Sequence, residues 1–308
     1  MVVRCVLAAS MVLLMWTAPR PGGVVLLGEE SPQESPDRAF AYDRAAPLDV
    51  RNVATRTVDG ATVHDLTYAA VNPRHGRIPA FLVKPRGRGP FAGVLYFHWL
   101  GQPRGDRTEF LDEALAGARD GVVSLLIQGY FPWTEAPADG ATDRQQVIDQ
   151  TIDARRAMDL LLSQPEVHGR RVAFVGHDYG AMYGAIIAGL ERRARAYVLV
   201  AGMGTFSDWS LKYWPGTAAG SEAEYRRALA GVDPIHYIAV ASPAALLFQF
   251  ARRDIYITEA AATEFFDEAS GPKEIRWYDA EHDLHIDAAA KDRREWLARQ
   301  LNLAVGVR

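Results

Sequence analysis

The chain has 308 residues and a mass of 33.9 kDa; 49% of its residues are hydrophobic and 23% charged, a composition that excludes disorder over most of its length. Its 34 Lys and Arg face 38 Asp and Glu, and this near balance excludes the basic surface that binding to nucleic acid requires. No apolar run reaches the ~18 residues of a membrane-spanning helix. The single cysteine, Cys5, excludes an intrachain disulfide and a site made of several cysteines.

The N-terminal residues 1–28 begin with a short basic stretch, which is followed by the apolar run Cys5–Ala18. This pattern predicts a signal peptide or membrane anchor, and therefore export or membrane tethering. A start codon assigned too early or a disordered extension is the alternative, and the protein would then be cytoplasmic. Residues 29–48 are polar and contain proline, which predicts a linker before a folded domain over residues 49–308.

Short apolar runs follow at regular intervals from about residue 49 and predict eight strands. Several of them are continuous Val, Leu and Phe runs, as expected for strands covered on both faces. The predicted strands are Thr62–Val71, Arg77–Lys84, Ala92–His98, Val122–Gln128, Arg171–Gly176, Ala196–Ala201, Ala244–Phe250 and Glu274–Tyr278.

Amphipathic stretches lie between most of these strands and predict helices. Strands that alternate with helices predict an α/β fold with a mostly parallel sheet and helices on both faces. The first two strands have no helix between them, so we expect an antiparallel hairpin at one edge. The predicted helices are Arg107–Arg119, Thr142–Gln164, Tyr179–Arg193, Glu222–Ala230, Glu259–Glu268 and Ala288–Leu301.

The segment Gly176-His177-Asp178-Tyr179-Gly180 connects an apolar strand directly to a helix. This is the pattern of a nucleophile elbow, in which glycines allow a tight turn and the central residue projects at the carboxyl end of the sheet. The central residue here is Asp178, where serine is usual. A structural turn whose aspartate caps the helix is the alternative interpretation of this motif alone.

Two later strands also end at chemically active residues. Asp254 follows the strand Ala244–Phe250, and His282 follows the strand Glu274–Tyr278. Nucleophile, acid and histidine in this chain order predict a triad of Asp178, Asp254 and His282. Asp208 is a second candidate for the acid, and His285 is a second candidate for the histidine.

Taken together, these segments resemble the α/β-hydrolase superfamily over residues 77–301, and most closely the dienelactone hydrolase-like and prolyl-oligopeptidase-like hydrolases. The elbow, in contrast, is similar to the Gly-His-Asp-Trp-Gly elbow of epoxide hydrolases and haloalkane dehalogenases. The resemblance implies the α/β-hydrolase fold with an eight-stranded sheet. It rests on the elbow, on Lys84-Pro85, Gly89–Val94 and His98, on Asp233–Ile238, on Asp254 and on Tyr278–Leu284.

The same resemblance implies an oxyanion hole and a substrate pocket. The loop after the third predicted strand would supply one backbone N–H group, at Trp99, and Tyr179 would supply the other. His98 is expected to hold that loop. The indole of Trp99 faces the leaving group or packs over the site, and Trp133 is expected to line the rim of the pocket.

Residues 202–243 are rich in aromatic side chains and predict a short lid over the site. Epoxide hydrolases use two lid tyrosines to protonate the opening oxygen, so the resemblance makes Tyr213 and Tyr225 candidates for that role. A small aromatic core of the insertion itself is the alternative.

An aspartate nucleophile favours particular substrates. Its carboxylate is ionised at neutral pH, but its adduct with an ester carbonyl would expel the carboxylate again. Attack on the saturated carbon of an alkyl halide or epoxide gives a stable alkyl ester on Asp178, which water activated by His282 then hydrolyses while Asp254 orients the imidazole.

The sequence therefore predicts a hydrolase of small epoxides or alkyl halides. Two alternatives stay open: an ester or lactone hydrolase in which Asp178 and His282 activate water, and a catalytically silent binding module. No spacing indicates a metal site, and Gly202-Met203-Gly204 lacks the third glycine of a dinucleotide fingerprint. We therefore expect a small-molecule substrate and no cofactor, with the oligomeric state left open.

Overall fold

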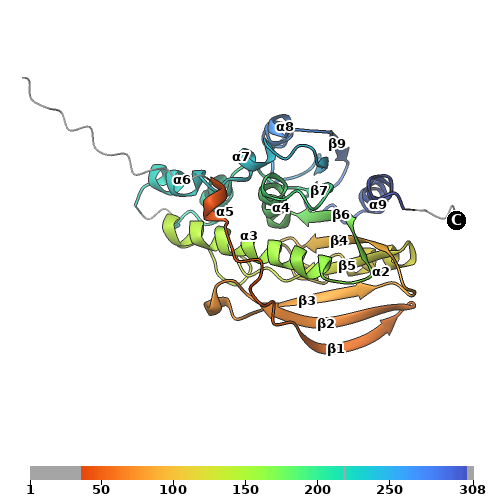
Figure 1. Ribbon diagram of the computed structural model, residues 1–308. Helices are drawn as coiled ribbons and strands as arrows, with labels where there is room; N and C mark the ends of the chain where they lie inside the picture. Colours follow the sequence, from red (N-terminus) through yellow and green to blue (C-terminus); the bar gives the residue numbers. More distant parts are fainter. Residues whose placement is uncertain (1–35, 218–219, 304–308) are drawn as a thin grey trace, which may run out of the picture. The chain divides into compact units, whose positions relative to one another are not determined.

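The computed structural model describes residues 36–217 and 220–303, so the prediction for residues 1–28 lies outside the described part (Figure 1). Its strands form one sheet in the order β1-β2-β3-β5-β4-β6-β7-β8-β9. The strands are β1 (Arg51–Val58), β2 (Ala61–Ala69), β3 (Arg77–Lys84), β4 (Phe91–Phe97), β5 (Val122–Ile127), β6 (Val167–His177), β7 (Ala196–Val200), β8 (Ala245–Ala251) and β9 (Lys273–Tyr278).

The sheet is mostly parallel, as predicted. The six strands from β5 to β9 in sheet order pair in parallel, whereas β1, β2 and β3 pair antiparallel with their neighbours and form one edge. The sheet has nine strands instead of eight, because β1 was missed. Seven of the eight residues of β1 are exposed, so no apolar run indicates the strand in the sequence.

Helices cover both faces of the sheet (Figure 1). The α2 helix begins four residues later than predicted, and α1, α5 and α7 were not predicted. The helices are α1 (Pro36–Ala39), α2 (Leu111–Arg119), α3 (Gly140–Leu162), α4 (Tyr179–Leu190), α5 (Phe206–Tyr213), α6 (Glu222–Ala230), α7 (Pro234–Ile238), α8 (Glu259–Glu268) and α9 (Asp287–Leu301), with a 3₁₀ turn, η1, at Pro73–His75.

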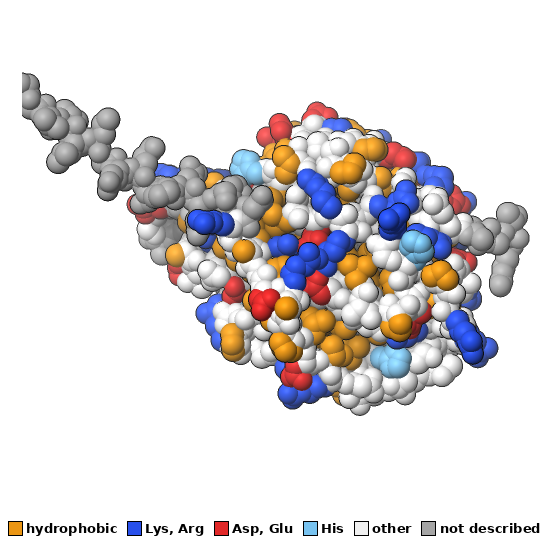
Figure 2. All heavy atoms as spheres, viewed as in Figure 1, with side chains coloured by type: hydrophobic (Ala, Val, Ile, Leu, Met, Phe, Trp, Pro, Cys, Tyr) orange, Lys and Arg blue, Asp and Glu red, His pale blue; other side chains and the backbone are white. Residues whose placement is uncertain are grey.

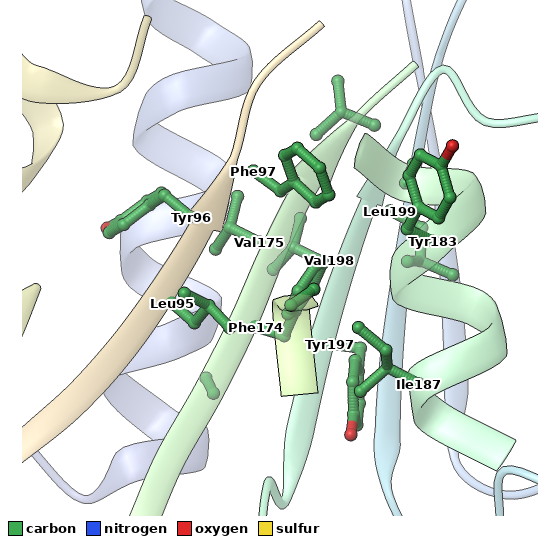
Figure 3. Packing of buried hydrophobic residues seen from close by; sticks show 14 of the residues in the cluster. Leu95, Tyr96, Phe97, Phe174, Val175, Tyr183, Ile187, Tyr197, Val198 and Leu199 are labelled. Atoms are coloured by element: carbon green, nitrogen blue, oxygen red, sulfur yellow. The ribbon is translucent and has the colours of Figure 1, made fainter. Parts of the chain in front are cut away.

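The core lies between the central strands and α4. Figure 3 shows Tyr183 and Ile187 of α4 facing side chains of β6 and β7, among them Phe174 and Val198. All four side chains are fully buried. Because α4 packs this closely on the sheet, its first residue is fixed at the carboxyl end of β6.

The described part of the expected linker, residues 36–48, packs on the domain. Phe40 is fully buried, and its ring meets the ring of Tyr237 edge-on at 5.5 Å. Its carbonyl accepts a hydrogen bond from Arg155 at 2.6 Å, and the Tyr42 hydroxyl donates to Asp159 at 2.9 Å. These contacts join residues more than 100 positions apart, which the polar local composition does not indicate.

Within the described residues, no helix has the length and hydrophobicity needed to cross a bilayer. Lys and Arg side chains are interspersed with Asp and Glu on the face seen in Figure 2. Positive and negative side chains are therefore mixed on that face.

Candidate active site

The elbow forms a strained turn between β6 and α4. Asp178 has φ +55° and ψ −118°, a backbone conformation that residues with a side chain seldom adopt. A Cβ atom on Gly176 would lie 2.2 Å from the carbonyl oxygen of Gly180, and one on Gly180 would lie 2.3 Å from that of Phe97. Both glycines are therefore needed for the close approach of the turn to α4 and to β4.

The three residues of the predicted triad lie together. His282 Nδ1 is 2.7 Å from Asp254 Oδ2, and His282 Nε2 is 3.8 Å from Asp178 Oδ1. The other oxygen of Asp254 accepts the backbone N–H groups of Tyr256 and Ile257 at 2.7 and 2.9 Å. Asp254 is thus held from two sides and fixes the imidazole ring with its Nε2 toward Asp178.

Charge in this triad favours a protonated histidine. Burial alone would lower the pKa of His282, but the carboxylates of Asp178 and Asp254 outweigh burial and raise this pKa to about 9. Burial would raise the pKa of Asp254, but its hydrogen bond and ion pair with His282 lower it below the usual value. At neutral pH, His282 is therefore an imidazolium between two carboxylates.

The backbone donor at Asp178 comes from Leu100 rather than from Trp99. Leu100 N–H donates to Asp178 Oδ2 at 3.0 Å. The predicted donor, Trp99 N–H, instead donates to Glu109 Oε2 at 2.7 Å. Tyr179 directly follows Asp178 as the first residue of α4, where the helix leaves its first N–H groups without an intrahelical acceptor.

His98 holds the loop that carries Leu100. Its Nε2 accepts a hydrogen bond from Gly129 N–H at 2.9 Å, so its Nδ1 carries the proton and donates to the carbonyl of Trp99 at 2.8 Å. Burial lowers the pKa of His98 to about 4, which keeps the ring neutral. Trp133 Nε1 donates to the same carbonyl at 2.7 Å. Both side chains therefore support the loop.

Aromatic side chains surround the histidine. The rings of Tyr256 and Trp209 lie 4.8 and 5.7 Å from that of His282. The ring of Tyr213 packs at a tilt against the rings of Trp209 and Tyr256, at 5.1 and 5.2 Å. The buried hydroxyl of Tyr213 has no hydrogen-bond partner among the described residues. The hydroxyl of Tyr225, in contrast, donates to Asp143 at 2.6 Å and is committed there.

Comparison with curated proteins finds partial similarity. The chain is 26% identical over 141 residues to acyl-coenzyme A amino acid N-acyltransferase 2 of Rattus norvegicus and 27% identical over 129 residues to acyl-coenzyme A thioesterase 1 of Mus musculus. These matches cover 46% and 42% of this chain, and the chain spans only 31% and 28% of the two relatives. No protein-family model matches the chain.

Solved structures match over most of the chain. The acetyl xylan esterase from Paenibacillus sp. R4 superposes with a TM-score of 0.70 at 20% identity, over 86% of this chain and 93% of that one. Acetyl xylan esterase 1 from Thermoanaerobacterium gives 0.67 at 16% identity, over 87% and 92%. A candidate dienelactone hydrolase from Klebsiella pneumoniae gives 0.57 at 13% identity, over 79% and 99%. This chain has the α/β-hydrolase fold.

Within this α/β-hydrolase fold, Asp208 and His285, the alternative candidates for the acid and the histidine, contact other residues. Asp208 is half exposed and pairs with Arg226 on α6. His285 Nε2 lies 3.4 Å from Glu109 and forms no ion pair with Asp178 or Asp254. The structure therefore brings His282, and not His285, to the elbow.

Sequence reasoning missed Glu109, whose buried carboxylate lies beside the site. Glu109 occupies the turn before α2, in a stretch predicted as the start of a helix, and no local motif indicates its role. Its Oε1 lies 2.6 Å from His177 Nδ1. The ring of His177 stacks on that of Trp99 at 5.2 Å and 3°. Only the folded arrangement reveals this cluster, because its members lie far apart in the chain.

Glu109, His177 and His285 also bring three atoms of metal-ligand type within 4.8 Å of one another. Two ligands of one tetrahedral zinc ion would lie ~3.3 Å apart. The 2.6 Å hydrogen bond between Glu109 and His177 is too short for that, and the donor set in this arrangement does not fit a metal ion.

Proposed function

We propose that this protein is a hydrolase in which Asp178 forms an alkyl ester with a small epoxide or alkyl halide. One observation carries the proposal. Asp178 Oδ2 accepts the Leu100 N–H group, while Oδ1 is buried, lacks a hydrogen-bond partner among the described residues and faces His282 Nε2 at 3.8 Å. That distance is too long for a hydrogen bond, so one lone pair of Oδ1 is free to attack carbon.

The first step needs no base. Asp178 Oδ1 attacks the saturated carbon, the carbon–oxygen ester bond forms, and the carbon–halogen bond breaks with its electron pair leaving on halide. With an epoxide, the ring carbon–oxygen bond breaks instead, and the ring oxygen takes a proton, for which the unpartnered Tyr213 hydroxyl is the candidate donor.

The second step needs a neutral histidine, and the first step supplies it. Ester formation removes the negative charge of Asp178, one of the two charges that raise the pKa of His282. The imidazolium releases its proton to solvent or, after epoxide opening, to the Tyr213 phenolate, and the neutral ring then accepts a proton from the water that attacks the Asp178 carbonyl carbon. The Leu100 N–H group stabilises the resulting oxyanion, and His282 protonates the leaving alcohol. The proton of the resulting Asp178 carboxylic acid then passes to His282, which restores the carboxylate and the imidazolium.

We infer that residues 202–243 act as a short lid over this site. Phe206 and Trp209 of α5 support the inference, since their rings lie 6.0 and 5.6 Å from that of Tyr179. Trp209 also lies against His282. The lid would then supply apolar surface to a small-molecule substrate.

Ester or lactone hydrolysis is the second candidate. The names of the similar proteins favour it, since they include esterases and thioesterases. In that mechanism, Asp178 and His282 would activate water directly in the resting enzyme. The two carboxylates raise the pKa of His282 and favour its protonated form in the resting enzyme, which weighs against this route.

Removing His282 should separate the two steps. With a reactive alkyl halide or epoxide, we expect His282→Gln to consume one equivalent of substrate per enzyme and then stop. Intact-protein mass spectrometry should show the added alkyl mass on the peptide that contains Asp178. The Asp178→Asn variant is the control, and it should give neither burst nor adduct because an amide is a poor nucleophile.

Other results would decide between the alternatives. Wild-type cleavage of simple esters or lactones, without an adduct from several halides and epoxides, would replace the alkyl-ester mechanism with direct activation of water. Absence of turnover with all of these substrates would favour a silent binding module.

A further inference from the structure

The Glu109 carboxylate is buried and lies within hydrogen-bond distance of three other residues. Its side chain is 2% exposed. Oε2 accepts Trp99 N–H at 2.7 Å, and Oε1 lies 2.6 Å from His177 Nδ1 and 3.4 Å from His285 Nε2. Burial would raise the pKa of Glu109, but the charge of His177 and these hydrogen bonds lower it to about 2. Glu109 is thus an ionised acceptor inside the protein.

His177 lies between two acceptors. Nδ1 faces the ionised Glu109, and Nε2 lies 3.2 Å from the carbonyl oxygen of His282. A carboxylate and a carbonyl can only accept, so each ring nitrogen of His177 faces an acceptor. Glu109 and His177 therefore form a buried, hydrogen-bonded pair at ion-pair distance.

This pair connects three loops, and each connection lies at or next to a residue of the proposed reaction. Trp99 precedes Leu100, whose N–H group contacts Asp178. His177 precedes Asp178 itself, and its other nitrogen holds the backbone of His282. The three loops otherwise come from separate strand ends, β4, β6 and β9, with no covalent connection near the site.

We propose that Glu109 is a positioning residue that sets the oxyanion donor, the nucleophile and the base relative to one another through its hydrogen bonds to Trp99 and His177. The proposal rests on the proposed function for its kinetic consequence. Its structural part, the fixing of the Trp99 loop, can be tested without any substrate.

A carboxylate is suited to this task because it accepts from two directions at once. A glutamine keeps the length and one acceptor oxygen for Trp99 N–H, and its NH₂ group can donate to the unprotonated Nδ1 of a neutral His177. A leucine keeps approximately the volume but forms neither bond, and it leaves the buried Trp99 N–H group without an acceptor. The two substitutions at Glu109 therefore separate loss of the connection from loss of charge.

Glu191 offers a matched control. It is a carboxylate of similar burial, 4% exposed, which pairs with Arg155 and Arg193 after the last residue of α4. Asp178 lies at the other end of this 12-residue helix, ~18 Å away along its axis. Glu191→Leu therefore also removes a buried carboxylate from its partners, but far from the reacting groups.

The experiment measures adduct formation, steady-state turnover and backbone exchange in the full chain. For Glu109→Leu we expect kcat to fall ~100-fold with KM within ~3-fold, because misplaced groups slow chemistry more than binding. Glu109→Gln should remain within ~5-fold of wild type, because its hydrogen bonds preserve the position of the loops. Glu191→Leu should lower stability but leave kcat unchanged.

Hydrogen exchange of the Trp99 amide provides the readout without substrate. It should be protected in wild type and Glu109→Gln, and should exchange at least ~10-fold faster in Glu109→Leu, where its acceptor is gone. Unchanged protection in Glu109→Leu overturns the inference whatever the enzyme hydrolyses. Wild-type kcat in folded Glu109→Leu, or an equal loss in Glu109→Gln, overturns it as well. Failure to find any substrate, with the exchange result as expected, counts against the proposed function only.

Discussion

Two buried histidines next to the elbow have different hydrogen-bond partners. His98 accepts a hydrogen bond from a backbone N–H group on one nitrogen, which leaves only one nitrogen to carry a proton. His177 faces an acceptor group at each of its two ring nitrogens. Residue type alone does not indicate either arrangement.

The protonation of His282 leads to a prediction about pH. Its folded pKa of about 9 lies above the unfolded value of ~6.5, so the ring stays protonated across neutral pH. If Asp178 attacks carbon directly, the rate of alkylation in single-turnover experiments should be nearly constant from pH 6.5 to 8.5. The titrating groups that face this ring are Asp178 and Asp254, with His177 and Tyr256 beside it.

Direct activation of water gives a different profile. Its rate would increase ~10-fold for each unit by which the pH rises, up to about pH 9, because only the neutral ring accepts a proton. A slope of that size in the burst phase contradicts covalent alkylation. The same ionisation affects folding: the stabilisation from protonated His282 is complete below ~6.5 and is lost as the pH rises through about 9.

Among the candidate site residues, the sequence indicated those that lie directly at strand ends. Asp254 and His282 follow apolar strands, and parallel strands end at the same edge of the sheet, so their meeting with Asp178 could be predicted. The backbone N–H group that donates to the Asp178 carboxylate belongs to Leu100, one residue after the Trp99 that the resemblance implied. Glu109 determines that offset from ten positions away, and neither spacing nor composition shows which carboxylate will fold against the loop.

At the level of elements, the turn between β6 and α4 tolerates no Cβ atom at Gly180. Gly180→Ala would place a Cβ atom 2.3 Å from the carbonyl oxygen of Phe97. We expect the free energy of unfolding to fall by about 2–3 kcal/mol, as for other overpacking substitutions. Alkylation of Asp178 should also slow, because the loop after β4 must move away from the elbow.

Gly231 is the matched control for this substitution. It follows α6 with φ −72°, and nothing lies within 4 Å of its Cβ position. Gly231→Ala should therefore change stability by less than ~0.5 kcal/mol in urea unfolding. Equal losses in the two variants would contradict the role given to the close approach at Gly180.

The elements that could be predicted are those with a strong local signal. The bounds of α6 and α8 match the prediction, because polar caps at Ser221 and Thr258 precede their first turns. Exposed β1 contains no apolar run, and α5 and α7 are too short to show a clear helical period, although the polar residues Thr205 and Asp233 precede them. The α5 helix buries Phe206 and Trp209 against other segments, so tertiary packing rather than local periodicity defines it.

The whole molecule includes the segment before β1, and Phe40 joins that segment to the core. Because its ring is fully buried against Tyr237, Phe40→Ala should lower the free energy of unfolding by about 3 kcal/mol. Val53→Ala on β1, where the side chain is 65% exposed, should change it by less than ~0.5 kcal/mol. Urea unfolding measures the free energy of unfolding of both variants, provided that their m-values equal that of wild type. Equal stability of Phe40→Ala and wild type would contradict the role given to the Phe40 ring.

The overall architecture was the most predictable property, since alternating strands and helices leave few topologies. The docking of residues 36–48 was not predictable, because the segment is polar on average and its anchors, the ring of Phe40 on Tyr237 and the hydrogen bonds of Phe40 and Tyr42 to α3, join residues more than 100 positions apart.

The positive φ of Asp178 has a consequence for heat resistance. A side chain in this region of backbone space costs ~1–3 kcal/mol, a sizeable fraction of the net stability of a typical domain. Glycine would adopt the same turn without that cost, and it would leave no buried carboxylate to satisfy. Selection of this chain for survival at high temperature alone would therefore remove the aspartate early. The backbone strain of a non-glycine residue at the elbow opposes thermal stability, and a requirement for the carboxylate explains why an aspartate stands there.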